Sequence, residues 1–97
     1  MIEDVLRSVA IQLMEKPQID SDGKSWKVTR SSSRGLRMAK VQINGREIQA
    51  IEQNRQKLSR WGRLAKEGHQ VVQFRDVLTG KYVAVVVDGE VRLYGKE

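Results

Sequence analysis

A run of six apolar residues near the C-terminus is the feature from which the rest of the chain is interpreted. The run is Tyr82–Val87, and four of its residues are valine, which favours a strand over a helix. Asp88-Gly89 follows as a two-residue hairpin turn. Alternation along the strand predicts two apolar faces: Tyr82, Ala84 and Val86 on one, and Val83, Val85 and Val87 on the other. A strand that is apolar on both faces requires cover on both sides.

Residues 1–16 predict an amphipathic helix. Its apolar stripe follows helical spacing and consists of Ile2, Val5, Leu6, Val9, Ala10 and Leu13. Glu3 and Asp4 in the first turn suit the positive end of the helix dipole, and Pro17 ends the helix. This helix is the expected cover for one face of the valine-rich strand. Its other possible role is to form a dimer face with a second chain.

Residues 24–53 predict a set of basic strands. The expected strands are Ser25–Ser31, Leu36–Ile43 and Glu47–Glu52, with a turn over Gln18–Lys24, a bulge near Met38-Ala39 and a hairpin turn at Asn44-Gly45. An alternative stays open, because the apolar spacing also fits one long helix from about residue 46 to 67. Asn44-Gly45 and Gly62 favour a strand, a loop and then a short helix.

That short helix is predicted over residues 59–67. Ser59 is its expected N-cap and Gly68 its C′ residue. Trp61, Leu64 and Ala65 form the inward stripe of this helix. A C-terminal meander over residues 70–95 follows, with a strand at Val71–Arg75 and a turn at Asp76–Gly80 ahead of the valine hairpin.

The predicted fold is therefore a single α+β domain over residues 1–97. An N-terminal helix precedes about six antiparallel strands in the order β-β-β-α-β-β-β, which form a curled sheet or a partly open small barrel. The chain has no cysteine, no cationic region leading into an apolar run at its start, and no apolar stretch of roughly 20 residues. A soluble cytoplasmic domain without membrane attachment is expected.

The net charge of +6 is concentrated in the middle of the chain. Residues 1–23 carry two basic and five acidic residues, a net of −3; residues 24–66 carry twelve and two, a net of +10; residues 67–97 carry four and five, a net of −1. Such a block attracts anionic partners, although a basic surface also serves solubility alone.

The candidate nucleic-acid or anion-binding residues all come from this basic block. They are Arg30, Arg34, Arg37, Lys40, Arg55, Lys57, Arg60, Arg63 and Lys66. Arginine offers a bidentate fork to phosphate, and the Ser-Gly loop between Arg30 and Arg37 adds hydroxyl and amide donors. Stacking on single-stranded bases requires exposed aromatic side chains, for which Tyr82 and Tyr94 are the candidates.

A search for catalytic and metal-binding patterns is negative. The chain has one histidine, His69, and no phosphate-binding glycine loop, dinucleotide fingerprint or nucleophile elbow. Asp76, Asp88 and Glu90 are the acidic residues that could converge on a site with His69, but turns and solvent exposure explain them as well. No enzyme activity, cofactor or metal is expected.

The segment Asn54–Phe74 resembles a segment of small uncharacterised cyanobacterial proteins. The shared residues are Ser59-Arg60-Trp61, Leu64-Ala65 and Glu67-Gly68-His69-Gln70-Val71-Val72. The resemblance covers about a fifth of the chain. It implies no activity, cofactor or site.

Two functional hypotheses follow from the residues. The first is a non-enzymatic nucleic-acid-binding module that contacts phosphates through the basic surface of residues 30–66. The alternative is a protein-interaction or assembly module, in which the basic face meets an acidic protein or a second copy covers the valine-rich strand.

Overall fold

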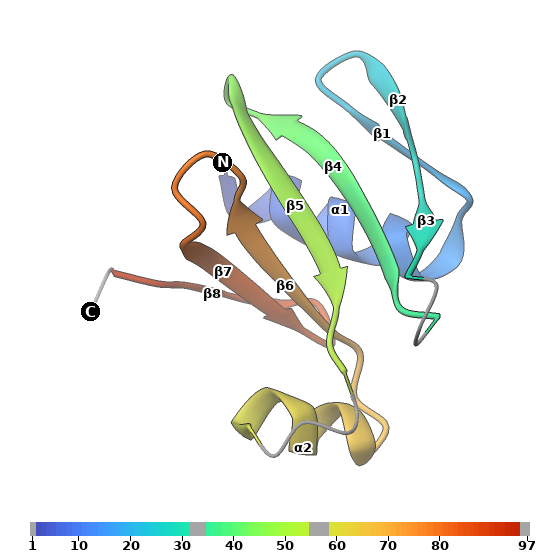
Figure 1. Cartoon of the computed structure of the whole chain (residues 1–97), viewed down its shortest axis with the longest axis vertical. Helices are drawn as coiled ribbons and strands as arrows, with labels where there is room; N and C mark the ends of the chain where they lie inside the picture. Colours follow the sequence, from blue (N-terminus) through green and yellow to red (C-terminus); the bar gives the residue numbers. More distant parts are fainter. Residues whose placement is uncertain (1, 32–34, 55–58, 96–97) are drawn as a thin grey trace.

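Two helices and two antiparallel sheets make up the described part of the chain (Figure 1). The structure is a computed structural model, and it describes residues 2–31, 35–54 and 59–95. The helices are α1 (Ile2–Glu15) and α2 (Arg60–Lys66). The strands are β1 (Gln18–Ser21), β2 (Lys24–Lys27), β3 (Thr29–Arg30), β4 (Arg37–Ile43), β5 (Arg46–Glu52), β6 (Val71–Asp76), β7 (Tyr82–Val87) and β8 (Glu90–Leu93).

The larger sheet is a six-stranded meander in which each strand pairs with its neighbour in sequence. Its order is β3-β4-β5-β6-β7-β8, and every pairing is antiparallel. The sheet curls but does not close, since β3 and β8 remain at its two edges. The predicted α+β curled sheet is confirmed.

The two predicted hairpin turns are confirmed by their backbone angles. Asn44 and Gly45 have φ of 52° and 77°, and Asp88 and Gly89 have φ of 50° and 86°. Positive φ at both central residues twists the turn in the direction that the flanking strands need, and asparagine, aspartate and glycine tolerate it best. These turns set the registers of the β4–β5 and β7–β8 pairs.

Helix α1 lies across one face of the larger sheet, where the main core forms (Figure 1). Leu6, Val9, Ala10 and Leu13 of α1 are buried against the alternate residues of the strands, with Phe74 fully buried at the centre. Arg7 ties this helix to the β7–β8 turn, because its Nε donates to the carbonyl oxygen of Gly89 at 2.7 Å. The predicted N-terminal cover is confirmed; the helix ends one residue before the predicted Lys16, and Met1 lies outside the described residues.

Helix α2 covers part of the opposite face of the same sheet. Its Ala65, with Trp61 and Leu64 beside it, packs on Val71, Val85 and Val87 in a second apolar cluster. The Ser59 hydroxyl accepts a hydrogen bond from the Gly62 N–H at 3.1 Å, as an N-cap does. Both predicted covers of the valine-rich strand are therefore supplied by the chain itself.

The predicted division of the valine-rich strand into two faces is wrong at its first two residues. Phe74 pairs with Ala84 but Arg75 pairs with Tyr82, so Val83 is an extra residue in a β-bulge. Val83 consequently packs on the main core beside Ala84. Tyr82 points to the other face, beside Arg75. The bulge predicted near Met38-Ala39 is wrong as well, because β4 pairs with β5 without a register shift.

The segment before β4 contains more strand than predicted. The expected turn over Gln18–Lys24 exists at Asp22-Gly23 but is shorter than predicted, since Gln18–Ser21 and Lys24–Lys27 form the strands of a β1–β2 hairpin. The expected strand over Ser25–Ser31 is interrupted at Val28, which separates β2 from β3. The larger sheet has the expected six strands, and the β1–β2 hairpin adds two more.

The alternative of one long helix from residue 46 is also wrong. Residues 46–52 form β5, which is paired on both sides with β4 and β6. The predicted loop that follows lies partly at residues 55–58, outside the described residues.

Candidate functional site

The nine predicted anion-binding residues do not form one surface. Arg34, Arg55 and Lys57 lie outside the described residues. Arg30 and Arg37 lie together on the α1 side of the sheet, near the end of that helix. Lys40 lies on the opposite side of the sheet. The last three, Arg60, Arg63 and Lys66, are exposed on α2.

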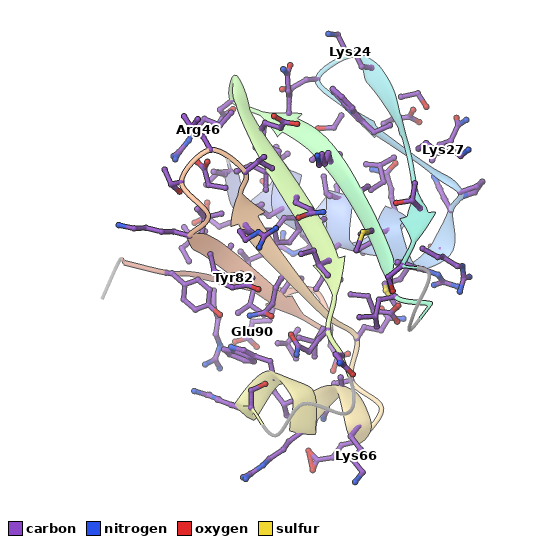
Figure 2. The ribbon with its side chains drawn as sticks, in the orientation of Figure 1. Lys24, Lys27, Arg46, Lys66, Tyr82 and Glu90 are labelled. Carbon is purple, nitrogen blue, oxygen red and sulfur yellow. The ribbon has the colours of Figure 1, made fainter. Side chains whose placement is uncertain are left out.

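The side of the larger sheet that faces away from α1 is the most extensive candidate surface; we call it the open face. The register puts the following side chains on it: Met38, Lys40, Gln42, Glu47, Gln49, Ile51, Gln73, Arg75, Tyr82, Val85, Glu90, Arg92 and Tyr94. Figure 2 views the molecule from this side, with the labelled Tyr82 on the near side of β7. Helix α2 covers the part of this face that carries Val71, Val85 and Val87.

One row of side chains crosses four adjacent strands of the open face. Lys40 pairs with Gln49, Gln49 with Arg75, and Arg75 with Tyr82. At a strand spacing of about 4.8 Å the row is about 14 Å long. It therefore presents two cations, an amide and an aromatic ring in one line.

Two tyrosines are exposed on the part of the open face that β7 and β8 form. The exposed fractions are 43% for Tyr82 and 37% for Tyr94. The Tyr94 hydroxyl lies 3.5 Å from the amide nitrogen of Gln73, and its backbone N–H donates to the Val83 carbonyl. Both tyrosines were predicted to be free of the core, and the structure confirms that they are exposed on one side of the sheet.

Arg75 occupies the middle of the row with its hydrogen-bonding capacity only partly used. Its Nη2 donates to the side-chain oxygen of Gln49 at 2.9 Å. Its Nε is buried and has no hydrogen-bond partner within residues 2–31, 35–54 and 59–95. No carboxylate in that part of the chain forms an ion pair with Arg75 either. A buried donor without a partner is uncommon in folded proteins.

Helix α2 extends the positive charge beyond the end of the open face. Arg60 lies with its guanidinium carbon 4.9 Å from the centre of the Trp61 ring, a cation–π contact that holds both side chains against the helix. Arg63 and Lys66 follow on the exposed side of α2, and Figure 2 shows Lys66 on its outer surface. Acidic residues also lie near α2: Glu67 is its C-cap residue and Asp88 contacts His69. Glu47 and Glu90 lie on the open face, where Glu90 is paired with Arg92 at 3.6 Å.

His69 and Asp88 form a hydrogen-bonded pair beside α2. His69 Nδ1 lies 2.6 Å from one carboxylate oxygen of Asp88, and the other oxygen accepts the Gln70 N–H at 2.8 Å. The hydrogen bond to Asp88 is the main cause that raises the pKa of His69 above its usual 6.5. The same bond, followed by the Gln70 N–H, lowers the pKa of Asp88 below its usual 3.8. The pair connects the residues that follow α2 to the β7–β8 turn.

Asp76 is the last residue of β6, and the turn that leads from β6 to β7 holds its side chain in place. The side chain is buried, forms an ion pair with Arg46, and accepts the N–H groups of Leu78 and Thr79 at 2.9 and 3.2 Å. The hydrogen bond from the Thr79 N–H is the main cause that lowers the pKa of Asp76, and the hydrogen bond from the Arg46 side chain lowers it further. The four residues considered for a cryptic catalytic site do not converge, since Asp76 and Asp88 lie at opposite ends of β7.

Within the described residues no group of three or more histidine, cysteine or acidic side chains has the arrangement of a metal site. No helix there has the length and apolar character needed to cross a bilayer.

Comparison of the chain with protein-family models, with curated proteins and with solved structures found no match. The resemblance of Asn54–Phe74 to small cyanobacterial proteins therefore stays a prediction.

The sequence-based prediction missed Gln49, Gln73, Arg75 and Arg92 as members of a common surface. Each occupies a strand position that alternates with core residues, which is a detectable signal. Alternation alone shows that such a side chain faces away from the core. Only the strand registers show that Arg75 lies between Gln49 and Tyr82.

Proposed function

We propose that this protein is a non-enzymatic module that binds single-stranded nucleic acid on the open face of its larger sheet. The main support is the row of side chains that crosses β4 to β7, with a second exposed tyrosine, Tyr94, on the same face. The row consists of Lys40, Gln49, Arg75 and Tyr82. Bases stack on exposed aromatic rings, and cationic side chains attract the phosphates that follow.

The partly unsatisfied Arg75 supports this proposal. Its side chain forms no ion pair with a carboxylate among the described residues, so a positive group without a negative partner there lies in the middle of the surface. Phosphate and base-edge oxygens are suitable acceptors for a guanidinium. Arg60, Arg63 and Lys66 add positive charge where α2 borders the face, so a strand that leaves the sheet continues along a basic helix.

This site differs from the one expected from sequence alone. The predicted surface consisted of cations from residues 30–66, whereas the proposed one joins Lys40 and the α2 cations to residues of β6, β7 and β8. Arg30 and Arg37 are excluded from it, because they lie on the α1 side of the sheet.

The alternative, a protein-interaction module, loses one of the two features that favour it in the sequence. A second molecule is not needed to cover the valine-rich strand, because α1 and α2 cover it. The positive charge of the basic surface still favours an acidic protein as a partner.

The test is a fluorescence titration of short mixed-sequence DNA and RNA, single-stranded and duplex, at low and physiological salt. Single strands are expected to bind more tightly than duplexes. The affinity should fall steeply with salt, with a slope of roughly −0.7 per phosphate contact. Light scattering on the same samples reports the oligomeric state, and a dimer without nucleic-acid binding would favour the assembly alternative.

Tyr82→Ala is the variant that separates stacking from simple charge attraction. Loss of one stacked base costs about 1–3 kcal/mol, so the affinity should fall about tenfold, with the salt slope unchanged. Tyr82→Phe is the matched control and should bind normally. Equal binding by all three proteins would remove the tyrosine from the interface.

Lys40→Gln tests the phosphate contact at the other end of the row. It should weaken binding to every sequence alike and reduce the salt slope by about one contact. Lys24→Gln removes the same charge from the β1–β2 hairpin, which Figure 2 shows at the end of the molecule far from α2. If Lys24→Gln weakens binding as much as Lys40→Gln, the attraction comes from net charge and the proposed surface is wrong.

A further inference from the structure

Arg30 and Arg37 face each other directly across the β3–β4 pair. Like charges placed opposite each other on neighbouring strands repel and destabilise the pair. Neither guanidinium has an ion-pair partner among residues 2–31, 35–54 and 59–95. The juxtaposition therefore has an electrostatic cost that no ion pair among the described residues offsets.

The structure holds one of the two arginines firmly and leaves the other free. Arg37 is half-buried, and its Nη1 donates to the Met14 carbonyl at the end of α1. Its backbone N–H is bound by the Glu52 carboxylate at 3.1 Å. Arg30 is exposed, and among the described residues its side chain makes one long hydrogen bond of 3.4 Å, from its Nη1 to the Gly35 carbonyl. Most of the guanidinium donors of this pair thus have no partner in the described part of the chain.

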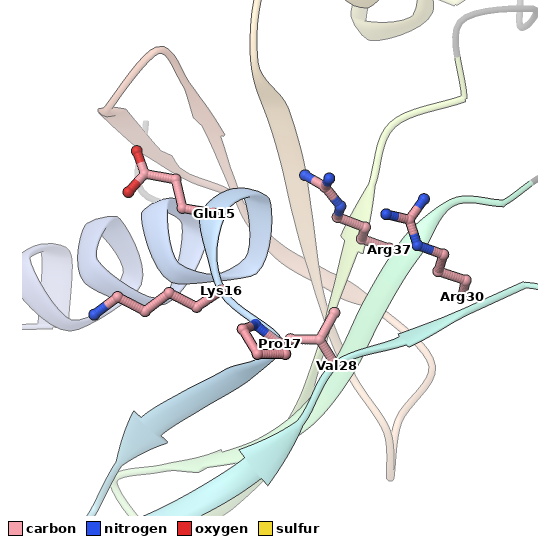
Figure 3. A pocket seen from close by; sticks show the side chains of 6 residues that line it. All are labelled: Glu15, Lys16, Pro17, Val28, Arg30 and Arg37. Atoms are coloured by element: carbon pink, nitrogen blue, oxygen red, sulfur yellow. The ribbon is translucent and has the colours of Figure 1, made fainter.

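The two arginines line a pocket of about 300 Å³ between the end of α1 and the β3–β4 pair (Figure 3). Figure 3 shows their guanidinium groups on the strand side, while Glu15 and Lys16 extend from the helix side. Pro17 and Val28 form an apolar part of the lining. This volume is at the lower limit for small-molecule sites, so it admits a compact group.

The charge of the lining defines the ligand class. The positive charge comes from the two guanidinium groups of Arg30 and Arg37. Glu15 and Lys16, whose side chains extend away from these groups in Figure 3, have opposite charges that cancel, so the lining has a net charge of +2. A phosphate monoester carries about −1.5 to −2 at pH 7. Its three terminal oxygens match the planar forks of two guanidinium groups, a geometry that lysine alone does not provide.

We infer that this pocket is a binding site for a phosphate monoester, either a small free one or the terminal phosphate of a nucleic-acid strand. It lies on the side of the sheet opposite the open face, so it is separate from the surface proposed above. Arg30 and Arg37 bind the phosphoryl oxygens, and Pro17 and Val28 contact the organic part.

The first experiment titrates inorganic phosphate and phenyl phosphate into the isotope-labelled protein at constant ionic strength, with NMR detection of arginine Nε–H and backbone amide signals. Saturable shifts are expected at Arg30 and Arg37. Arg30→Gln should weaken phosphate binding about tenfold or more, because it removes a charge-assisted donor set. Arg30→Lys, which keeps the charge but not the fork, should retain only part of the affinity.

Lys81→Gln is the matched control, since it removes one exposed cation at the start of β7, far from the pocket. It should leave the phosphate shifts unchanged. Shifts spread over the cationic surface, or shifts that persist in Arg30→Gln, would overturn the proposal.

Thermal unfolding supplies an independent second readout. Without phosphate, Arg30→Gln should unfold at a higher temperature than the unmodified protein, because the cross-strand repulsion is relieved. With saturating phosphate the order should reverse. A variant that is less stable in both conditions would contradict the repulsion argument.

The source of the phosphate is distinguished by single strands with and without a 5′-phosphate. Tighter binding of the phosphorylated strand that depends on Arg30 indicates a strand end. Equal binding of both strands, with phenyl phosphate still bound, indicates a free monoester. Tyr82→Ala is expected to leave the phosphate shifts intact, so failure of the open-face proposal and failure of this one give different results.

Discussion

At the scale of residues, the chain uses its few special side chains mainly to join elements. His69 and Asp88 connect the segment after α2 to the β7–β8 turn. Asp76 organises the opposite end of β7 through two backbone N–H groups and Arg46. These contacts explain conspicuous charged residues without catalysis.

The His69–Asp88 pair predicts a measurable titration, which is easy to follow because the chain contains one histidine. The ring signals of His69 should titrate with a pKa above 6.5, chiefly because of the hydrogen bond to Asp88. In Asp88→Asn the pKa should fall towards 6.5. NMR titration of both proteins measures the difference, and the same pKa in both would show that the pair does not persist in solution.

The same pair predicts the pH range in which it stabilises the fold. Because the pKa of His69 is raised in the folded protein, the stabilisation that His69 gives the fold is complete below about pH 6.5. It is lost as the pH rises through the pKa of the folded protein. The lowered pKa of Asp88 means that its contribution is complete above about 3.8 and is lost as the pH falls through its folded-state value. His69→Gln should thus cost most between these two values. The effect should be small, since both side chains are about half exposed.

At the scale of elements, α2 depends on the sheet for its existence. It has seven residues, too few for an isolated helix to be stable in water. Its stability comes from the Ser59 cap and from packing on Val71, Val85 and Val87. Because these contacts are separate from the main core on the other face of the sheet, α2 can unfold while that core stays intact.

Ala65→Asp is predicted to detach α2 while the sheet stays folded. Ala65 is buried, and a carboxylate there lacks a partner, so the free energy of unfolding should fall by about 1–3 kcal/mol. Hydrogen exchange should accelerate at residues 60–66 and change little in β4 and β5. Lys66→Gln, on the exposed side of the same helix, also lowers the net charge by one and is the control for charge. Accelerated exchange throughout the sheet in Ala65→Asp would contradict an independent α2.

Element boundaries were predictable where local chemistry determines them. Pro17 ends α1, Ser59 and Gly68 bound α2, and the two hairpin turns carry asparagine or aspartate before glycine. The β1–β2 hairpin was missed because Asp20 and Ser21 have turn propensity but are strand residues here. The N–H of Asp20 donates to the Gln12 side chain at 2.9 Å, and buried Ile19 anchors the strand under α1. Tertiary packing overrides local propensity at such a place.

At the scale of the whole molecule, one face of the larger sheet carries most of the buried apolar side chains. Phe74 is fully buried at its centre, under α1. Phe74→Ala should lower the free energy of unfolding by about 3–5 kcal/mol, a large part of the total for a small domain. Urea denaturation followed by circular dichroism measures the loss.

The control for this variant is Leu78→Ala in the β6–β7 turn. Leu78 is 94% exposed, so its truncation should change the stability by less than about 0.5 kcal/mol. A large effect at Leu78 would indicate that this side chain is buried by a partner in solution. A small effect at Phe74 would contradict the described core.

The amino-acid sequence by itself determined the class of fold and the elements that depend on neighbouring residues: α1, the two hairpins, the capped α2, and a valine-rich strand that needs two covers. Helical and strand periodicities and turn residues act over a few positions, so they can be read locally. The concentration of positive charge in residues 24–66 was visible in the same way.

Only the tertiary structure decided which charges meet. The β3–β4 register brings Arg30 opposite Arg37, and three successive registers align Lys40, Gln49, Arg75 and Tyr82. The bulge opposite Phe74 and Arg75 turns Tyr82 to the open face, and no local pattern in the valine-rich run predicts this bulge. A change of one residue in register moves a side chain to the other face of a sheet. The two proposed sites therefore depend on strand pairing, which is a property of distant residues rather than of any one stretch.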